Sequence, residues 1–536
     1  MADRSQALAS PSAWEEPDRA ARLLPRLPEE TGLAPRDAQA LLRLCEESAD
    51  PDGALAGAVR ALGARRARLG RPASPAALQP LVTVCAASRY LADHLAARPR
   101  LLDLLPMLSG MTRTASETLA TGFRLANAPD AEAFARGLRR HKLVEMLRIA
   151  LRDLTGRAPL PESARELSFL ASSVLEAAVR FHYRRLCAQH GAPEGRTAAG
   201  PSGFCVLGMG KLGGTELNFS SDVDLLYVYD RDGRTQGPQA IDHFAFYARL
   251  AEEVTRAVGA MPFVFRVDLD LRPEGRSGPI VNSLRALELY YEAQGAPWER
   301  FALIKALPVA GDLPVGEEAL RRLVPFVWRK YLDLGAVEEM RALKARAERE
   351  AGRRGKQDLK LGPGGIREVE FFVQALQLLH GGKDKNLRAR GTLPALERLL
   401  FAGFVDLQSA PLPLSIRTAN KIGVEAGVRA DPAGTRTTVT EMDGNAIIRL
   451  ARQDPCGATD SAAAITELDH VAVDGAMLTA GVADPSTQPQ SIGGSRTYDN
   501  NVIPSQLCQR FGRFLEPAVI GKSSVQNRRI GTKQKL

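Results

Sequence analysis

The sequence lacks the features of a membrane-spanning, secreted or thiol-rich metal-binding protein. No stretch approaches the roughly 18 consecutive apolar residues that a membrane-spanning helix needs, so no membrane span is expected. The N-terminal segment MADRSQALASPSAWEEPDRA has no apolar core and contains acids, which argues against a signal peptide. The chain has only 6 cysteines, which are scattered and form no CxxC pair. We therefore expect reduced thiols in a cytoplasmic protein, and neither a zinc site nor a disulfide framework.

Basic residues outnumber acidic ones by 71 to 62, which gives a formal net charge of +9. Such a balance is compatible with nucleic acid, with nucleotide phosphates or with an acidic partner. The arginines are spread through Ala- and Leu-rich stretches and do not form a basic tract. We therefore interpret most of them as solvated helix faces and do not expect a nucleic-acid surface.

With 536 residues, the chain is too long for a single hydrophobic core, and its 45% hydrophobic and 25% charged residues are ordinary for a globular protein. Helical spacing of apolar residues dominates before residue 195, and glycine-bounded apolar runs follow it. We predict five segments: a helical or poorly ordered segment at 1–75, an α-helical domain at 76–195, a mixed catalytic domain at 196–315, an α-helical domain at 316–406 and an atypical tail at 407–536.

The tail has little sustained periodicity and is rich in Gly, Thr, Ser, Asp and Asn. This composition predicts disorder. Its abrupt onset after about residue 406 suggests a change of reading frame in the gene. Sequencing the locus, or a peptide map of the native protein, would test that hypothesis.

The stretch GMGKLGGTELNFSSDVDLLYVYD, at 208–230, combines a glycine-rich turn with a predicted buried strand. The preceding run GFCVLGM is a second predicted strand. Glycines in such a turn allow backbone N–H groups to approach phosphate oxygens closely. The turn is not a Walker A loop, because no GK[ST] follows, and it lacks the spacing of a dinucleotide-binding fingerprint.

Two acids, Asp222 and Asp224, stand at positions i and i+2 at the start of the second strand. Side chains at this spacing point the same way, so both carboxylates should converge on one point while Val223 faces the core. Adjacent carboxylates repel each other unless a cation lies between them. Mg²⁺ is the natural ion, because it takes a few carboxylates and completes its shell with water and phosphate oxygens. The alternative is an acid pair at a strand edge that faces solvent.

A third acid is expected from the stretch FVFRVDLDLRP at 263–273, which alternates as a strand does. Asp268 and Asp270 would lie on one face, and either could be the ligand; we favour Asp268. Arg266 and Arg272 share that face. They could grip phosphate oxygens or form an ion-pair ladder with the two acids.

A glycine-rich turn, an Asp-x-Asp strand and a third Asp on another strand are typical of the polymerase-β-type nucleotidyltransferase fold. We therefore predict an α+β protein in which such a domain, at 196–315, is embedded between α-helical domains. In this chemistry two metal ions on three carboxylates align the attacking oxygen, the α-phosphorus and the leaving group.

Three long motifs resemble one family in particular, the bacterial bifunctional glutamine synthetase adenylyltransferase/adenylyl-removing enzymes. The motifs are GMGKLGGTELNFSSDVDLLYVY, FRVDLDLRPEGRSGPIVNSLRALELYYEAQGAPWERFALIKALPVAGD and DLKLGPGGIREVEFFVQALQLLHGG, and the likeness covers roughly 80–405. The resemblance implies a cytoplasmic, Mg²⁺-dependent regulator of nitrogen metabolism. Such enzymes attach AMP from ATP to a tyrosine of glutamine synthetase and remove it by phosphorolysis, yielding ADP. The PII signalling protein and glutamine set the direction.

The family carries two nucleotidyltransferase domains, an N-terminal one that removes AMP and a C-terminal one that attaches it. The single domain here follows a helical region and so resembles the adenylyl-removing half. No second Asp-x-Asp strand with a glycine loop follows residue 406, which puts the attaching activity in doubt and suggests a truncated copy. The alternatives are a catalytically silent copy that only binds glutamine synthetase or PII, and a nucleotidyltransferase that acts on another substrate such as RNA. The presence of Asp222, Asp224 and Asp268 argues against a catalytically silent copy.

The resemblance also implies roles for single residues. Asp222, Asp224 and Asp268 would be the catalytic residues and the metal ligands. Other positions would contact the ATP or ADP: Gly213, Gly214, Ser220 and Ser221 would line the phosphate site, and Arg272, Arg276 and Lys305 would contact the nucleotide or its phosphates. The family has arginine where this chain has Asp270, and an acid there would change the field around the metals.

Overall fold

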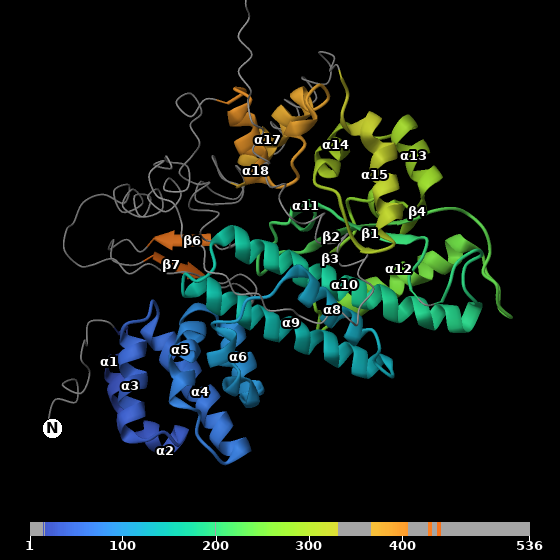
Figure 1. The fold of residues 1–536 in the computed structure, drawn as a ribbon. Helices are drawn as coiled ribbons and strands as arrows, with labels where there is room; N and C mark the ends of the chain where they lie inside the picture. The colour runs from blue at the N-terminus through green and yellow to red at the C-terminus, as the bar shows by residue number, and fades with distance from the viewer. Residues whose placement is uncertain are drawn as a thin grey trace, which may run out of the picture.

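The computed structural model describes residues 14–15, 17–198, 200–330 and 366–405, together with two short strands further on. Helices surround a small mixed sheet, in agreement with the predicted α+β class (Figure 1). No helix in the described ranges is long and apolar enough to cross a membrane. The predicted tail lies outside these ranges except for β6 (Gly427–Ala430) and β7 (Thr437–Thr440), which pair antiparallel. The polymerase-β-type assignment stays a prediction.

The N-terminal helices pack around a core of their own. They are α1 (Pro17–Leu23), α2 (Leu27–Thr31), α3 (Pro35–Glu46), α4 (Pro51–Leu69), α5 (Leu78–Ala87), α6 (Arg89–Ala97) and α7 (Leu105–Leu108). The next helix, α8 (Ala115–Leu125), packs instead along α10 (Leu160–His190), and its Leu119 clusters with Leu313. Helix α4 shows why they form where they do: the Asp50 side chain accepts a hydrogen bond from Gly53 N at its start, and Gly70 at its end has a φ of 66°. Leu41, Leu62 and Leu81 are fully buried in this core, which therefore continues across residue 75.

Two long helices, α9 (Ala131–Leu154) and α10 (Leu160–His190), lie between the N-terminal helices and the sheet (Figure 1). Helix α9 is buried on two sides, because Leu147 packs into the N-terminal core whereas Met146 packs into the core beneath the sheet. Its sequence is consequently less clearly amphipathic than that of a surface helix. Helix α9 therefore connects the two cores, and α10 packs against it in the core beneath the sheet.

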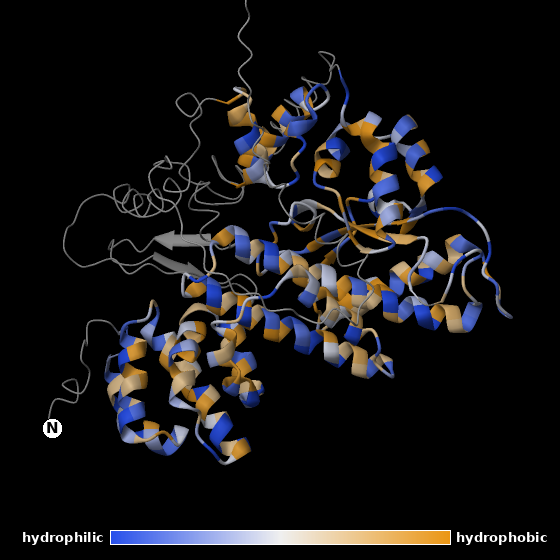
Figure 2. Ribbon diagram, in the orientation of Figure 1, coloured by the Kyte–Doolittle hydropathy of each residue, from blue (hydrophilic) through white to orange (hydrophobic). Residues whose placement is uncertain are grey.

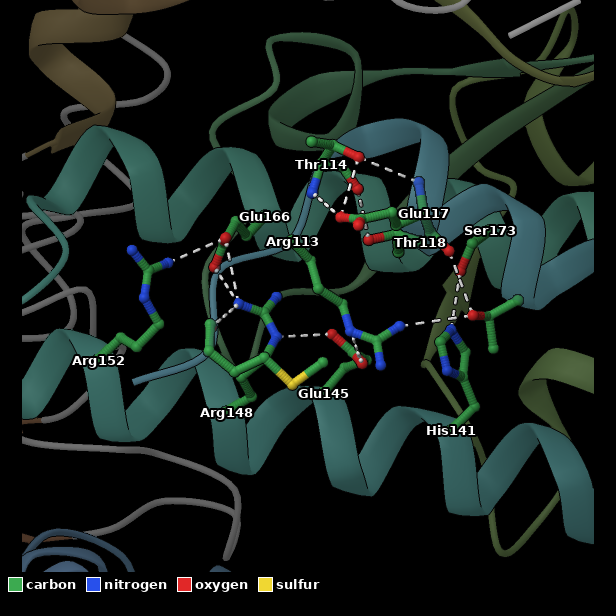
Figure 3. A network of polar contacts seen from close by, with 12 residues as sticks. Arg113, Thr114, Glu117, Thr118, His141, Glu145, Arg148, Arg152, Glu166 and Ser173 are labelled. Carbon is green, nitrogen blue, oxygen red and sulfur yellow. Dashed lines mark hydrogen bonds and ion pairs between the residues drawn. The ribbon is translucent and has the colours of Figure 1, made fainter. Parts of the chain in front are cut away.

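A buried network of charges fixes α9 against α10 (Figure 3). Arg148, which is 1% exposed, donates from Nε to Glu145 (2.8 Å) and from Nη1 to Glu166 (3.0 Å). Arg152 Nη1 also donates to Glu166, at 3.0 Å. Burial raises the pKa of Glu166, and the two guanidinium groups oppose that rise. Charged groups this deeply buried need partners, and each of these four has at least one.

The sheet contains β1 (Phe204–Gly208), β2 (Val223–Tyr229), β3 (Val267–Asp268), β4 (Val281–Ser283) and β5 (Leu307–Gly311), in the order β3-β2-β1-β5 with β4 also paired to β2. Strand β1 is antiparallel to β2 and β5, whereas β3 and β4 are parallel to β2. The predicted strands at GFCVLGM and DVDLLYVYD are thus present. Figure 2 shows these central strands coloured as hydrophobic.

Each face of the sheet is covered by helices. On one face, α10 and α12 (His243–Gly259) enclose Leu225 and Tyr227. On the other, α13 (Leu284–Ala293), α14 (Pro297–Ile304) and α15 (Leu313–Val327) enclose Leu226 and Val228. Asp224 has the same parity along β2 as Leu226, so its side chain belongs to the second face. The pair α17 (Ile366–His380) and α18 (Thr392–Phe401) follows with a small core of its own.

Candidate active site

The glycine-rich turn links β1 to a single turn of helix, α11 (Gly210–Gly213). Gly210 has a φ of +50°, and a Cβ there would collide with Oδ2 of Asp224. A Cβ at Gly213 would collide with the carbonyl oxygen of Lys305. The glycines therefore allow two close approaches, one by a carboxylate and one by backbone. Gly213 and Gly214, which we predicted to line a phosphate site, are both buried.

Two of the three predicted acids face each other across neighbouring strands. Asp224 on β2 stands opposite Asp268 on β3 in the parallel register. Paired residues of parallel strands project to the same side, so these two half-buried carboxylates share one face of the sheet beside Gly210. The backbone reinforces the arrangement, since Met209 N donates to the Asp224 carbonyl at 2.8 Å. The sequence had predicted this pairing of a strand acid with an acid from another strand.

Asp222 lies one residue before β2, and its side chain is 47% exposed. Its carboxylate accepts from Nε of Arg266, which also donates from Nη2 to the Ser220 carbonyl at 2.6 Å. Ser221 Oγ accepts from Asn218 N at 3.3 Å. Arg266 immediately precedes β3, so its two bonds tie the loop that contains both predicted serines to the start of that strand. In the described ranges, no three His, Cys, Asp or Glu side chains are grouped so as to hold a metal ion.

The predicted long strand at 263–273 is wrong. Val264 and Phe265 are both buried, which breaks the alternation, and only Val267–Asp268 is a strand. The chain then turns, because Arg272 donates to the carbonyls of the loop that follows: Leu269 at 2.9 Å, Arg276 at 3.2 Å and Gly278 at 3.3 Å. These bonds replace a strand ladder with a side-chain-stabilised loop.

Asp270 consequently leaves the face that carries Asp268. It is exposed, its backbone N donates to Asp268 Oδ1 at 2.7 Å, and its carboxylate accepts from Arg276 Nε at 3.0 Å. The side chain of Arg276 is 86% exposed, and bonding to it lowers the pKa of Asp270. The ion pair at this loop joins Asp270 to Arg276, whereas the ladder that we considered had Arg266 and Arg272 as its basic residues.

Lys305 is buried between two carboxylates. Its Nζ lies 2.6 Å from Glu216 and 2.6 Å from Glu370, and its side chain is 5% exposed. Burial disfavours its charge, but the two carboxylates outweigh that effect and raise the pKa of Lys305. Thr392 N also donates to Glu216, at 2.9 Å. Lys305, which we predicted to contact the nucleotide, thus connects the glycine-rich turn to α17 and α18 through its ion pairs.

The role of Glu216 and the partner of Arg266 were not predicted from the sequence. Glu216 holds Lys305 and Thr392, and Arg266 holds Asp222. The partners of Glu216 lie 89 and 176 positions away, so no local sequence pattern predicts these contacts. Arg266 was noticed as a phosphate-binding or ladder residue, and only its partner was missed.

Comparison with known proteins defines the class of the domain. Residues 78–322 match the family described as glutamate-ammonia ligase adenylyltransferase, and residues 340–411 match the one described as GlnD PII-uridylyltransferase. Both descriptions name nucleotidyltransferases, the class of protein that the domain resembles. Residues 78–322 of the chain are thus similar to the glutamate-ammonia ligase adenylyltransferase family. The resemblance inferred from the three motifs is confirmed.

Curated relatives agree with this assignment. Proteins named bifunctional glutamine synthetase adenylyltransferase/adenylyl-removing enzyme are 47% identical over 287 residues in Pseudomonas aeruginosa and 45% identical over 339 residues in Thioalkalivibrio sulfidiphilus. The matches cover 53% and 61% of this chain but 29% and 35% of those relatives. The chain thus spans about a third of the length of the curated relatives it matches.

Proposed function

We propose that the domain removes AMP from an adenylylated tyrosine of glutamine synthetase by Mg²⁺-dependent phosphorolysis, which yields ADP. The observation that carries this proposal is the register of Asp224 opposite Asp268, beside the glycine-rich turn, within the segment that matches the family. The relatives' name includes an adenylyl-removing activity. The position of the domain after a helical region favours that activity over attachment.

The reaction balances without a redox partner. An oxygen of inorganic phosphate attacks the phosphorus of the tyrosine-linked AMP, and a new P–O–P bond forms as the bond to the tyrosine oxygen breaks. The products are ADP and the tyrosine hydroxyl, which takes up one proton. Little covalent chemistry is required of the protein, so positioning and charge stabilisation are its main tasks.

The donor set suits Mg²⁺, a hard cation that takes one or two carboxylates and fills the remaining positions with water and substrate phosphate. Asp224 and Asp268 would supply those carboxylates. Asp222 would become a third ligand by exchanging its bond to Arg266 for the ion. Once bound, the ion would align the phosphates and offset their charge. Arg266 would then be available to an incoming phosphate oxygen.

Glutamine synthetase and the PII signalling protein are the partners that we propose. Support for PII comes from the match of residues 340–411 to a PII-uridylyltransferase family. The location that we propose is the cytoplasm, where thiols stay reduced, and the four cysteines in the described ranges are free and buried.

The proposal is tested by incubating the protein with adenylylated glutamine synthetase, Mg²⁺ and phosphate and measuring ADP. We expect ADP to form in proportion to the AMP lost from glutamine synthetase. Omission of phosphate should stop the reaction, and addition of uridylylated PII should accelerate it. Loss of AMP without formation of ADP would refute phosphorolysis. No release under any of these conditions, with a folded protein, would refute the assignment of activity.

A further inference from the structure

Lys142, on α9, is a buried cation that has no acidic partner among the residues that the structure describes. Its residue surface is 7% exposed, and within the described part of the chain no hydrogen bond or ion pair involves its ammonium group. Its Nζ lies 5.0 Å from the ring centroid of Phe265 and 5.9 Å from that of Phe263. Contacts with aromatic rings offset part of the cost of burying a charge, but they do not replace a counterion.

Neighbouring charges make the position of Lys142 less favourable. Burial, the charge of Arg98 and the charge of Lys142 lower the pKa of His94 on α6, and Arg98 Nη1 lies 2.7 Å from Nδ1 of that histidine. The acid beside this histidine, Asp93, is paired with Arg60 at 2.9 Å. Burial together with the charge of Arg266 lowers the pKa of Lys142 to about 8. Several basic groups thus lie near Lys142, and no carboxylate among the described residues pairs with its ammonium group.

This cationic region adjoins the candidate active site. Phe265, whose ring lies under Lys142, immediately precedes Arg266 in the chain, and Arg266 binds Asp222 and the Ser220 carbonyl. Val223 N donates to the Arg266 carbonyl at 2.9 Å, which fixes this segment against the start of β2. An anion held between Lys142 and Arg266 would therefore lie next to Asp222.

We propose that Lys142 and Arg266 form a phosphate-binding subsite at the edge of the candidate active site. Two adjacent cations, one of them buried without a counterion, favour a compact anion with more than one negative charge. The choice of phosphate rests on the proposed function, whereas the need for an anion rests on the charges alone. The phosphate could arrive as inorganic phosphate or as part of a nucleotide, and the experiment separates these sources.

The test measures binding and needs no turnover. Thermal unfolding of the full chain is followed as inorganic phosphate is added at constant ionic strength, with chloride as the balancing salt. For the native protein we expect a saturable rise of the midpoint. The Lys142→Met variant should unfold at the same or a higher temperature than the native protein without phosphate, and it should bind phosphate at least tenfold more weakly. Lys142→Arg should retain binding within a few-fold, and Lys385→Met, at an exposed lysine, should match the native protein.

The titration is repeated with ADP present. If ADP prevents phosphate binding and Lys142→Met weakens ADP binding as well, the subsite takes a nucleotide phosphate. If phosphate still binds alongside ADP, the subsite takes inorganic phosphate. Equal phosphate affinity in the native protein and Lys142→Met, or the absence of saturable binding by the native protein, would overturn the inference. Should Lys142→Met fail to fold, Lys142→Gln supplies the same comparison. Binding without ADP production in the activity assay would leave the subsite intact and refute the proposed function.

Discussion

Removal of Arg148 should destabilise the helical region far more than removal of an exposed arginine from the same helix. In the Arg148→Met variant, Glu145 and Glu166 would lose their buried partner while they stay 2% and 7% exposed (Figure 3). Breaking a buried ion pair costs about 3–5 kcal/mol. Arg113 and Arg152 would still contact the two acids, so we expect the lower end, about 3 kcal/mol.

The assay is thermal unfolding followed by circular dichroism at pH 7. For a cooperative unit of this size, about 3 kcal/mol corresponds to a drop in midpoint of roughly 6–12 °C. The matched control is Arg136→Met, which removes an exposed pair with Glu132 on α9 and should cost about 0.5 kcal/mol or less.

A double variant tests the cause of the loss. Adding Glu166→Gln to Arg148→Met removes the acid that was left under-compensated, so it should restore part of the midpoint. If Arg148→Met cost no more than Arg136→Met, the network would contribute little, and the argument from burial would be refuted.

Three further predictions concern the site and its surroundings. Gly213→Ala should destabilise the protein by about 3 kcal/mol, because the new Cβ meets the Lys305 carbonyl, whereas Gly63→Ala should be neutral or stabilising; urea unfolding compares them, and equal effects would contradict the packing argument. Lys305→Met should loosen α17 and α18, seen as faster hydrogen exchange there; unchanged protection would show that the pair does not depend on the ion bonds. Burial lowers the pKa of Lys142 from 10.5 to about 8, so the native state binds fewer protons than the unfolded chain between these values. The free energy of unfolding should therefore rise from pH 8 to 10 by up to about 3 kcal/mol relative to Lys142→Met. If the free energies of unfolding of the two proteins changed with pH in the same way, the lowered pKa of Lys142 would be refuted.

Local patterns predicted the parts of the fold that depend on local sequence. The runs at 204–208 and 223–229 are apolar, bounded by glycine or acid, and they are strands. Helix α10 begins after Pro159 and ends before Gly191, a boundary that the glycine marks in the sequence. Asp224 and Asp268 were expected on neighbouring strands, and they stand opposite each other.

The features that could not be predicted depend on contacts between residues that are far apart in the sequence. The alternation at 263–273 resembles a strand, but Arg272 finds loop carbonyls, and the chain turns after Asp268. The ion pairs of Lys305 could not be predicted, because its two acids come from distant segments of the chain. The sequence around Lys142 does not predict its burial, because the rings of Phe263 and Phe265 that it contacts lie more than 100 positions away.

The central claim is that the acids beside the glycine-rich turn catalyse removal of AMP, and one assay tests it most directly. ADP formation from adenylylated glutamine synthetase, Mg²⁺ and phosphate is compared between the native protein, Asp224→Asn and Asp222→Asn. Each substitution removes one charge at nearly equal size, so the thermal midpoint should hardly change. We predict ADP from the native protein and at least a hundredfold slower formation from each variant, as expected when a group acting on transition-state charge is lost. Full activity in Asp224→Asn would contradict the account.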